Sequence, residues 1–138
     1  MTVSNYRERK RQERRKQIED IIRMKRDRHK QELFRKRIDL ARQGLVFYSA
    51  RKHIQATRTF LTYLRILEEW KKCPAGGLQP SMFDAEQDQV EILILSGVYW
   101  DLAKIYDRGP SERSRTDMIQ YLEKFVLFTT EKPSAAIS

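Results

Sequence analysis

The segment 38–67, IDLARQGLVFYSARKHIQATRTFLTYLRIL, places apolar residues at intervals of three or four positions. Ile38, Ala41 and Leu45 begin this period, and leucines and aromatic residues continue it to the end of the segment. Such spacing puts apolar side chains on one face of a helix, so the segment predicts amphipathic helices and an all-α fold. No glycine or proline follows Leu45 in the segment, which leaves open one long helix or two helices with a turn near 51–53.

The next stretch, CPAGGLQP at 73–80, interrupts the helical pattern with two prolines and two glycines. This composition is typical of a loop. Ser81 follows, and Asp84 lies three residues later, a spacing that predicts a capping box and a helix running to about Asp107. The positive end of the helix dipole would accommodate the acidic residues near this start. These residues are Asp84, Glu86, Asp88 and Glu91.

A last helix is predicted at about 115–129, because Ser114 and Asp117 have the spacing of a second capped start. Pro133 and the small residues after it predict a flexible tail at 132–138. Together these elements predict a long charged N-terminal helix followed by two helical hairpins. The large residues predicted for the core are Phe47, Phe60, Leu64, Trp100, Leu102, Tyr106 and Phe125.

The net charge is concentrated at the N-terminus. Residues 1–42 contain 16 Lys and Arg against 7 Asp and Glu, whereas residues 43–138 contain 12 of each, so the formal charge of +9 belongs to the first part. Because Arg, Lys, Glu and Gln favour helices, the sequence predicts a basic helical arm at 1–36 and a hairpin body at 37–131. The candidate electrostatic contacts are Arg11, Arg14, Arg15, Arg26, Arg28 and Arg37.

Leu40, Gly44 and Phe47 place a large apolar, a small and an aromatic residue at spacings of four and three, and Ala56 and Phe60 follow as a small and an aromatic residue. This pattern resembles the tetratricopeptide repeat, a helix–turn–helix unit of about 34 residues. A weaker second set consists of Tyr99, Leu102, Ala103, Tyr106 and Phe125. The resemblance implies closely packed hairpins in a protein-interaction scaffold. A generic helical bundle is the alternative, because any helical hairpin needs small residues at its crossing.

Motifs for catalysis or metal binding are missing from the sequence. Cys73 is the single cysteine, which excludes an internal disulfide and suits a reducing, cytoplasmic compartment. His29 and His53 have no second ligand at helical spacing, and Gly76-Gly77 lacks the lysine of a phosphate-binding loop. We therefore expect a protein that is not an enzyme and that uses no cofactor and no metal.

The charge pattern favours a non-enzymatic adaptor or scaffold subunit, whose arm binds an acidic protein surface. An RNA- or DNA-associated protein is the alternative, since Lys and Arg would contact phosphates. An anionic membrane surface is a weaker candidate, because the apolar patch on the arm is narrow. The members of this narrow patch are Ile18, Ile21, Ile22 and Met24. Self-association through helix faces is a further alternative.

Overall fold

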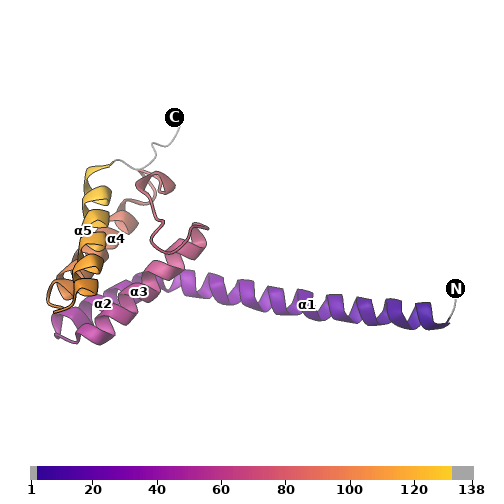
Figure 1. Cartoon of the computed structure of the whole chain (residues 1–138). Coiled ribbons are helices and arrows are strands. Elements are labelled where there is room, and N and C mark those ends of the chain that lie inside the picture. The colour runs from indigo at the N-terminus through magenta and orange to yellow at the C-terminus, as the bar shows by residue number, and fades with distance from the viewer. Residues whose placement is uncertain (1–2, 132–138) are drawn as a thin grey trace. The chain divides into compact units, whose positions relative to one another are not determined.

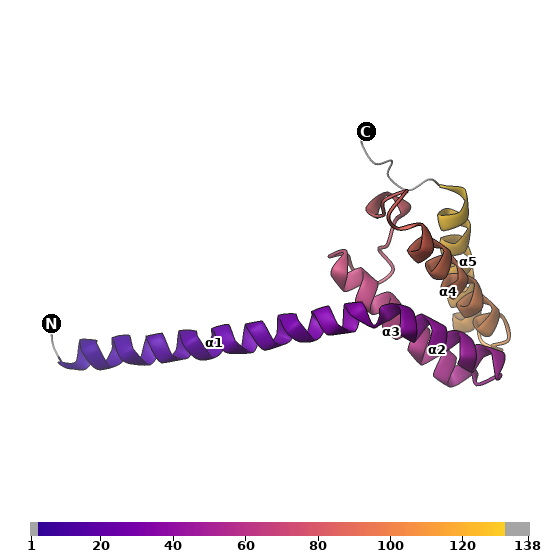
Figure 2. The ribbon, with the colours of Figure 1, turned by 180° about the vertical axis from the view of Figure 1, so that it is seen from behind.

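A computed structural model describes residues 3–131, and the regular structure in that range is helical, which confirms the all-α fold (Figures 1 and 2). Contacts divide the chain into two compact units, Met1–Arg35 and Lys36–Ser138. The predicted tail at 132–138 lies outside the described residues. The described elements are α1 (Val3–Arg35), α2 (Arg37–Ser49), α3 (His53–Trp70), the short 3-10 helix η1 (Pro80–Met82), α4 (Gln89–Asp107) and α5 (Glu112–Thr130).

The first unit consists of α1, a helix of 33 residues in which no described residue is buried. Its sequence contains no glycine or proline and is rich in strong helix formers. Ion pairs at helical spacing join Lys10 to Glu13 at 3.7 Å and Arg23 to Asp20 at 2.5 Å. Each such exposed pair adds only about 0.2–0.5 kcal/mol. The helix is therefore held by local interactions rather than by a core.

In the second unit, α2 and α3 form a hairpin, which answers the question left open by the period of 38–67. The chain turns at Arg51, whose φ of 62° lies in the left-handed region. The Lys52 backbone N–H then donates to the Phe47 carbonyl at 2.9 Å and closes the turn. A left-handed conformation costs a non-glycine residue about 1–2 kcal/mol, which the packing of the two helices must offset.

The two helices of this hairpin approach closely at Gly44. A Cβ atom built on Gly44 would lie 2.5 Å from Cε1 of Phe60, so the phenyl ring occupies the space that any side chain at position 44 would need. Phe60 is 1% exposed and Ala56 is fully buried. Small residues at the crossing thus allow a large aromatic ring to fill the gap between the helices.

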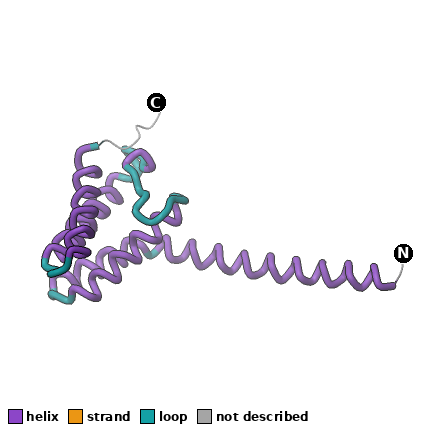
Figure 3. The backbone as a smooth tube through the Cα atoms, viewed as in Figure 1, coloured by secondary structure: helices purple, strands orange, loops and turns teal. Residues whose placement is uncertain are grey.

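Helices α4 and α5 form the second hairpin and lie side by side in both views (Figures 1 and 2). Short loops join the helices of each hairpin (Figure 3). The predicted start of its first helix at Ser81 is wrong, because α4 begins at Gln89. The Asp84 carboxylate instead accepts the backbone N–H groups of Glu86 and Gln87, both at 2.8 Å. An aspartate that binds its own downstream backbone favours a turn over a helix, which delays the start.

The start of α5 also differs from the prediction. The Ser111 hydroxyl accepts the Ser114 backbone N–H at 3.1 Å, so Ser111 is the N-cap and Ser114 lies in the first turn. Both residues belong to the same short polar stretch after Pro110. The helix therefore begins three residues earlier than predicted, capped by Ser111 rather than Ser114.

The core of the body contains Phe60, Leu64 and Leu102 as predicted, but Trp100 is 39% exposed and does not belong to it. The Trp100 ring packs against Phe125 at a centroid distance of 4.9 Å, towards the surface. Three predicted core residues are only partly buried: Phe47, Tyr106 and Phe125. The core also contains large residues that the prediction left out, among them Tyr63, Leu78, Phe83, Leu95, Val98, Tyr99 and Phe128.

Candidate functional site

Five of the six arginines predicted to contact an acidic partner lie on α1, and all five are exposed. They are Arg11, Arg14, Arg15, Arg26 and Arg28. Within residues 3–131 none of these five forms an ion pair with a carboxylate. At 1.5 Å per residue, α1 extends over about 50 Å. The arm therefore presents a long row of unpaired guanidinium groups to solvent.

Arg37, the sixth predicted contact, lies in the body and has a partner there. Its Nε donates to Oε1 of Glu91 at 2.6 Å, and the Glu91 side chain is only 8% exposed. The pair ties α2 to α4. Glu91 lies in the first turn of α4, where the helix dipole favours an acidic residue as predicted, and it also pairs with a charge that lies 54 residues away in the chain. The Tyr63 hydroxyl lies near this carboxylate, and burial together with the Glu91 charge raises the pKa of Tyr63.

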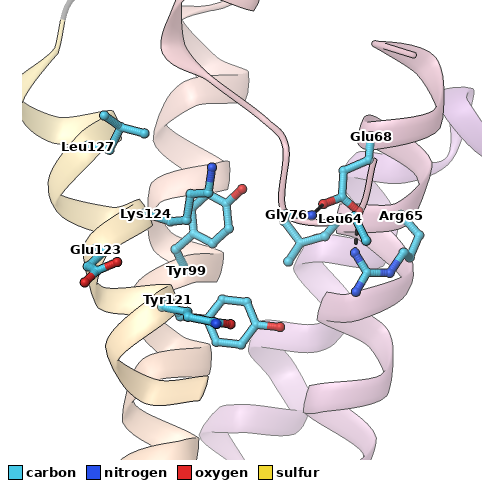
Figure 4. Close-up of a pocket in the computed structure, with 11 residues that line it drawn as sticks. Leu64, Arg65, Glu68, Gly76, Tyr99, Tyr121, Glu123, Lys124 and Leu127 are labelled. Carbon is cyan, nitrogen blue, oxygen red and sulfur yellow. Dashed lines mark hydrogen bonds and ion pairs between the residues drawn. The ribbon is translucent and has the colours of Figure 1, made fainter. Parts of the chain in front are cut away.

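The body contains a cleft between α3, α5 and the loop at Ala75 and Gly76, with a volume of about 590 Å³ (Figure 4). The Glu68 carboxylate, 5% exposed, pairs with Arg65 and accepts the Gly76 backbone N–H at 2.5 Å. Across the cleft, Lys124 Nζ donates to the Leu78 carbonyl at 2.7 Å. The charged residues of the cleft thus hold the loop of 73–80 against the helices.

Two tyrosines from α4 and α5 line the same cleft (Figure 4). The Tyr99 hydroxyl is buried and has no hydrogen-bond partner among the described residues. Burial raises the pKa of Tyr121 to about 12 and that of Tyr99 further, and burial lowers the pKa of Lys124. Burial also raises the pKa of the Cys73 thiol, which makes it a poor nucleophile. The cleft offers hydrogen bonds to a ligand.

A second, apolar depression of about 360 Å³ lies between α2 and α4, and we call it the α2–α4 groove. Leu93 and Leu45 on its rim are 72% and 50% exposed. This groove was not predicted from the sequence, although Leu93, Gly97 and Asp101 follow one another at the four-residue spacing of a single helix face. The residues that line the groove are Ile38, Ala41, Arg42, Leu45, Phe60, Leu93, Ile94, Gly97, Val98 and Asp101.

The residues of the repeat-like pattern divide between the core and its edge. Leu40, Phe47, Tyr106 and Phe125 are partly buried. The buried members are Gly44, Ala56, Phe60, Tyr99, Leu102 and Ala103. Both sets lie in the two hairpins, and α4 contacts α2 and α3 as well as α5.

Compared with protein-family models, with curated proteins and with solved structures, the chain gives no match. The tetratricopeptide resemblance therefore stays a prediction from residue spacing. In the described part of the chain, no group of three or more His, Cys, Asp or Glu side chains could hold a metal ion. Among the helices of residues 3–131, none combines the length and the apolar character needed to cross a membrane.

Proposed function

We propose that this protein is a non-enzymatic adaptor whose basic arm binds an acidic protein surface and whose hairpin body is a docking scaffold. The observation that carries the proposal is α1 itself: 33 residues with 13 basic and 6 acidic side chains and no described residue buried. A helix that is mostly charged, with only a narrow apolar patch, gains little from burial within its own chain. Its guanidinium groups are available for carboxylates, which they bind with charge-assisted hydrogen bonds.

The body supports the scaffold part of the proposal. The α2–α3 hairpin has a close helix crossing, with Gly44 against Phe60, and an apolar groove lies between α2 and α4. Two repeat-like hairpins are fewer than the three or more that usually make a stable stack, so a partner completing the stack is part of the proposal. A cytoplasmic location, suggested by the single thiol, belongs to the same proposal.

The test reverses charges in the arm and compares this with an equal reversal in the body. The arm variant is Arg11→Glu/Arg14→Glu/Arg15→Glu. We expect it to lose most partner capture from a lysate of the native cell treated with nuclease, while its thermal unfolding stays that of the wild type. Unfolding of the body in this variant, or capture equal to that of the wild type, would contradict the proposal.

The matched control changes the net charge by the same amount at exposed positions of the body. It is Arg58→Glu/Arg113→Glu/Arg115→Glu, at three arginines of α3 and α5 that are exposed. If capture depends only on total charge, both variants lose it equally. If it depends on the arm, as we propose, the control keeps it.

The second candidate function is binding of nucleic acid along the arm. It is favoured by the basic clusters around Arg9–Arg11 and Arg14–Lys16, since the spacing of cations along an exposed helix suits a row of phosphates. The interleaved Glu8 and Glu13 act against it by repelling phosphates. Binding of duplex and single-stranded oligonucleotides between about 50 and about 200 mM salt separates the two functions. A steep, sequence-independent loss with salt would favour nucleic acid.

A further inference from the structure

The α2–α4 groove contains a carboxylate that the body leaves without a partner. Asp101 is half-buried, and no hydrogen bond or ion pair to it exists among the described residues. Arg42, on α2, is the other charged residue that lines the groove, and it forms no ion pair with Asp101. Burial is the cause that raises the pKa of Asp101 to about 6. A half-buried charge among apolar side chains is unfavourable until a cation pairs with it.

The groove also contains a glycine that the body does not require. A Cβ atom built on Gly97 would meet nothing within 4 Å. Glycine in the middle of a helix weakens it, and at Gly44 the close ring of Phe60 explains the choice, whereas no such contact exists at Gly97. Its neighbour on the groove rim, Leu93, is 72% exposed. A glycine beside exposed leucines suits the close approach of a helix from outside the body.

The arm of this chain has the complementary features. Ile18, Ile21 and Ile22 are 57%, 53% and 50% exposed, at the i, i+3, i+4 spacing of a helix that docks into a groove. Cations lie on both sides of this patch, with Arg14 four residues before Ile18 and Lys25 four residues after Ile21. At this spacing the cations and the isoleucines share one face of the helix.

The distances along the helices favour an arm from another molecule as the occupant of the groove. Ile22 lies about 20 Å along α1 from its last residue, Arg35. The groove residues on α2 end at Leu45, within about 15 Å of Lys36, the one residue that joins the two helices. Measured along the helices from Lys36, the isoleucines therefore lie farther away than the last groove residue of α2.

We propose that the protein forms a dimer in which the α1 helix of each copy docks its isoleucine patch into the α2–α4 groove of the other. The isoleucines cover Leu45, Leu93 and the open surface at Gly97, and an arm cation pairs with Asp101. Reciprocal docking is a closed twofold arrangement, which doubles the contact and leaves no free groove. The arm residues before Arg14 stay outside the groove, so the dimer presents two basic segments to an acidic partner.

The test is sedimentation velocity on the full chain between about 1 and about 200 µM, because dimer formation depends on concentration. The groove variant is Gly97→Leu and the arm variant is Ile18→Glu/Ile22→Glu. We expect each to weaken dimerisation by at least about tenfold. The control, Ile54→Glu/Val126→Glu, adds the same charges at body positions that are 69% and 49% exposed and should leave dimerisation unchanged.

A separate measurement keeps loss of folding from imitating loss of dimerisation. Because nothing lies within 4 Å of the built Cβ, Gly97→Leu should raise the thermal unfolding temperature of the dilute protein, or leave it unchanged. Association would then weaken without any loss of folding stability. A Gly97→Leu protein that unfolds at a lower temperature than the wild type would contradict the account of the groove.

Mixing the two variants tests the reciprocal contact directly. Gly97→Leu keeps a normal arm, and Ile18→Glu/Ile22→Glu keeps a normal groove, so an equimolar mixture should form a heterodimer that neither variant forms alone. A wild type that stays monomeric over the whole range overturns the proposal. Dimers that survive Gly97→Leu indicate pairing of arm with arm, and dimers that survive the arm substitutions indicate pairing of groove with groove; either result overturns it as well.

Discussion

Helices α1 and α3 are stabilised by different interactions. The first has 33 residues and no buried one in its described range, whereas the second has 18 residues, of which seven are buried. Propensity and exposed ion pairs hold α1, and each contributes tenths of a kcal/mol. Burial of apolar side chains holds α3, and each large one contributes about 1.5–3 kcal/mol. Substitutions in α1 should therefore change binding, and substitutions in α3 should change folding.

Truncation of one large side chain in each helix should give the largest difference in stability between them. Phe60 is 1% exposed and fills the crossing at Gly44, so Phe60→Ala should lower the free energy of unfolding by about 3–5 kcal/mol. The matched change in the arm, Ile21→Ala, removes an isoleucine that is 53% exposed and should cost less than about 0.5 kcal/mol. Urea unfolding followed by circular dichroism measures both. Equal losses would show that the arm belongs to the folded core.

The same comparison applies to two arginines at the boundary of the units. Arg37→Ala leaves the Glu91 carboxylate, 8% exposed, without its cation, and should lower the free energy of unfolding by about 2 kcal/mol. Arg35→Ala removes an exposed arginine at the end of α1 and should change it by less than about 0.5 kcal/mol. A second variant, Arg37→Ala/Glu91→Gln, removes the unpaired charge and should recover part of the loss. Without recovery, the ion pair is not the cause.

The fold could be predicted as far as local spacing determines it. The apolar period of 38–67 predicted helices, and Gly44 with Phe60 marked their crossing, because neighbouring turns of one helix share a face. The predicted start of α4 was wrong, because the Asp84 side chain accepts hydrogen bonds from the backbone N–H groups of Glu86 and Gln87 rather than capping a helix. Sequence spacing alone does not distinguish these two uses of an aspartate.

The candidate sites were harder to predict, because their residues meet across the chain. The basic arm is visible in composition, since it needs no partner within the chain. The ion pair of Glu91 could not be predicted from the sequence, because its partner Arg37 lies 54 residues away. Trp100 has the size and spacing of a core residue, yet it lies on the outer side of α4 beside Phe125. The groove was missed because spacing shows which residues share a face, not which face stays uncovered.

The smallest expected effect is that of substituting Asp101. Its pH dependence should differ between the folding of the free body and the association of the proposed dimer. Because burial raises the pKa of its carboxyl to about 6 in the folded chain, above the ordinary value of 3.8, the folded state binds more protons between these pH values. The contribution of Asp101 to stability is therefore fully present below pH 3.8 and is lost as the pH rises through about 6. In dilute solution, Asp101→Asn should resemble the wild type near the lower pH and exceed its thermal stability above the higher one.

Association should show the opposite pH dependence, because an arm cation binds the ionised carboxylate of Asp101. Dimerisation of the wild type should strengthen as the pH rises through about 6, and that of Asp101→Asn should not follow this change. Asp107→Asn, at an exposed position of the same helix, controls for the loss of one negative charge. Sedimentation velocity at a pH on each side of this range measures the difference. If the wild type and Asp101→Asn associate equally at both, no cation of the second copy reaches the groove carboxylate, and the contact between arm and groove would rest on the isoleucines alone.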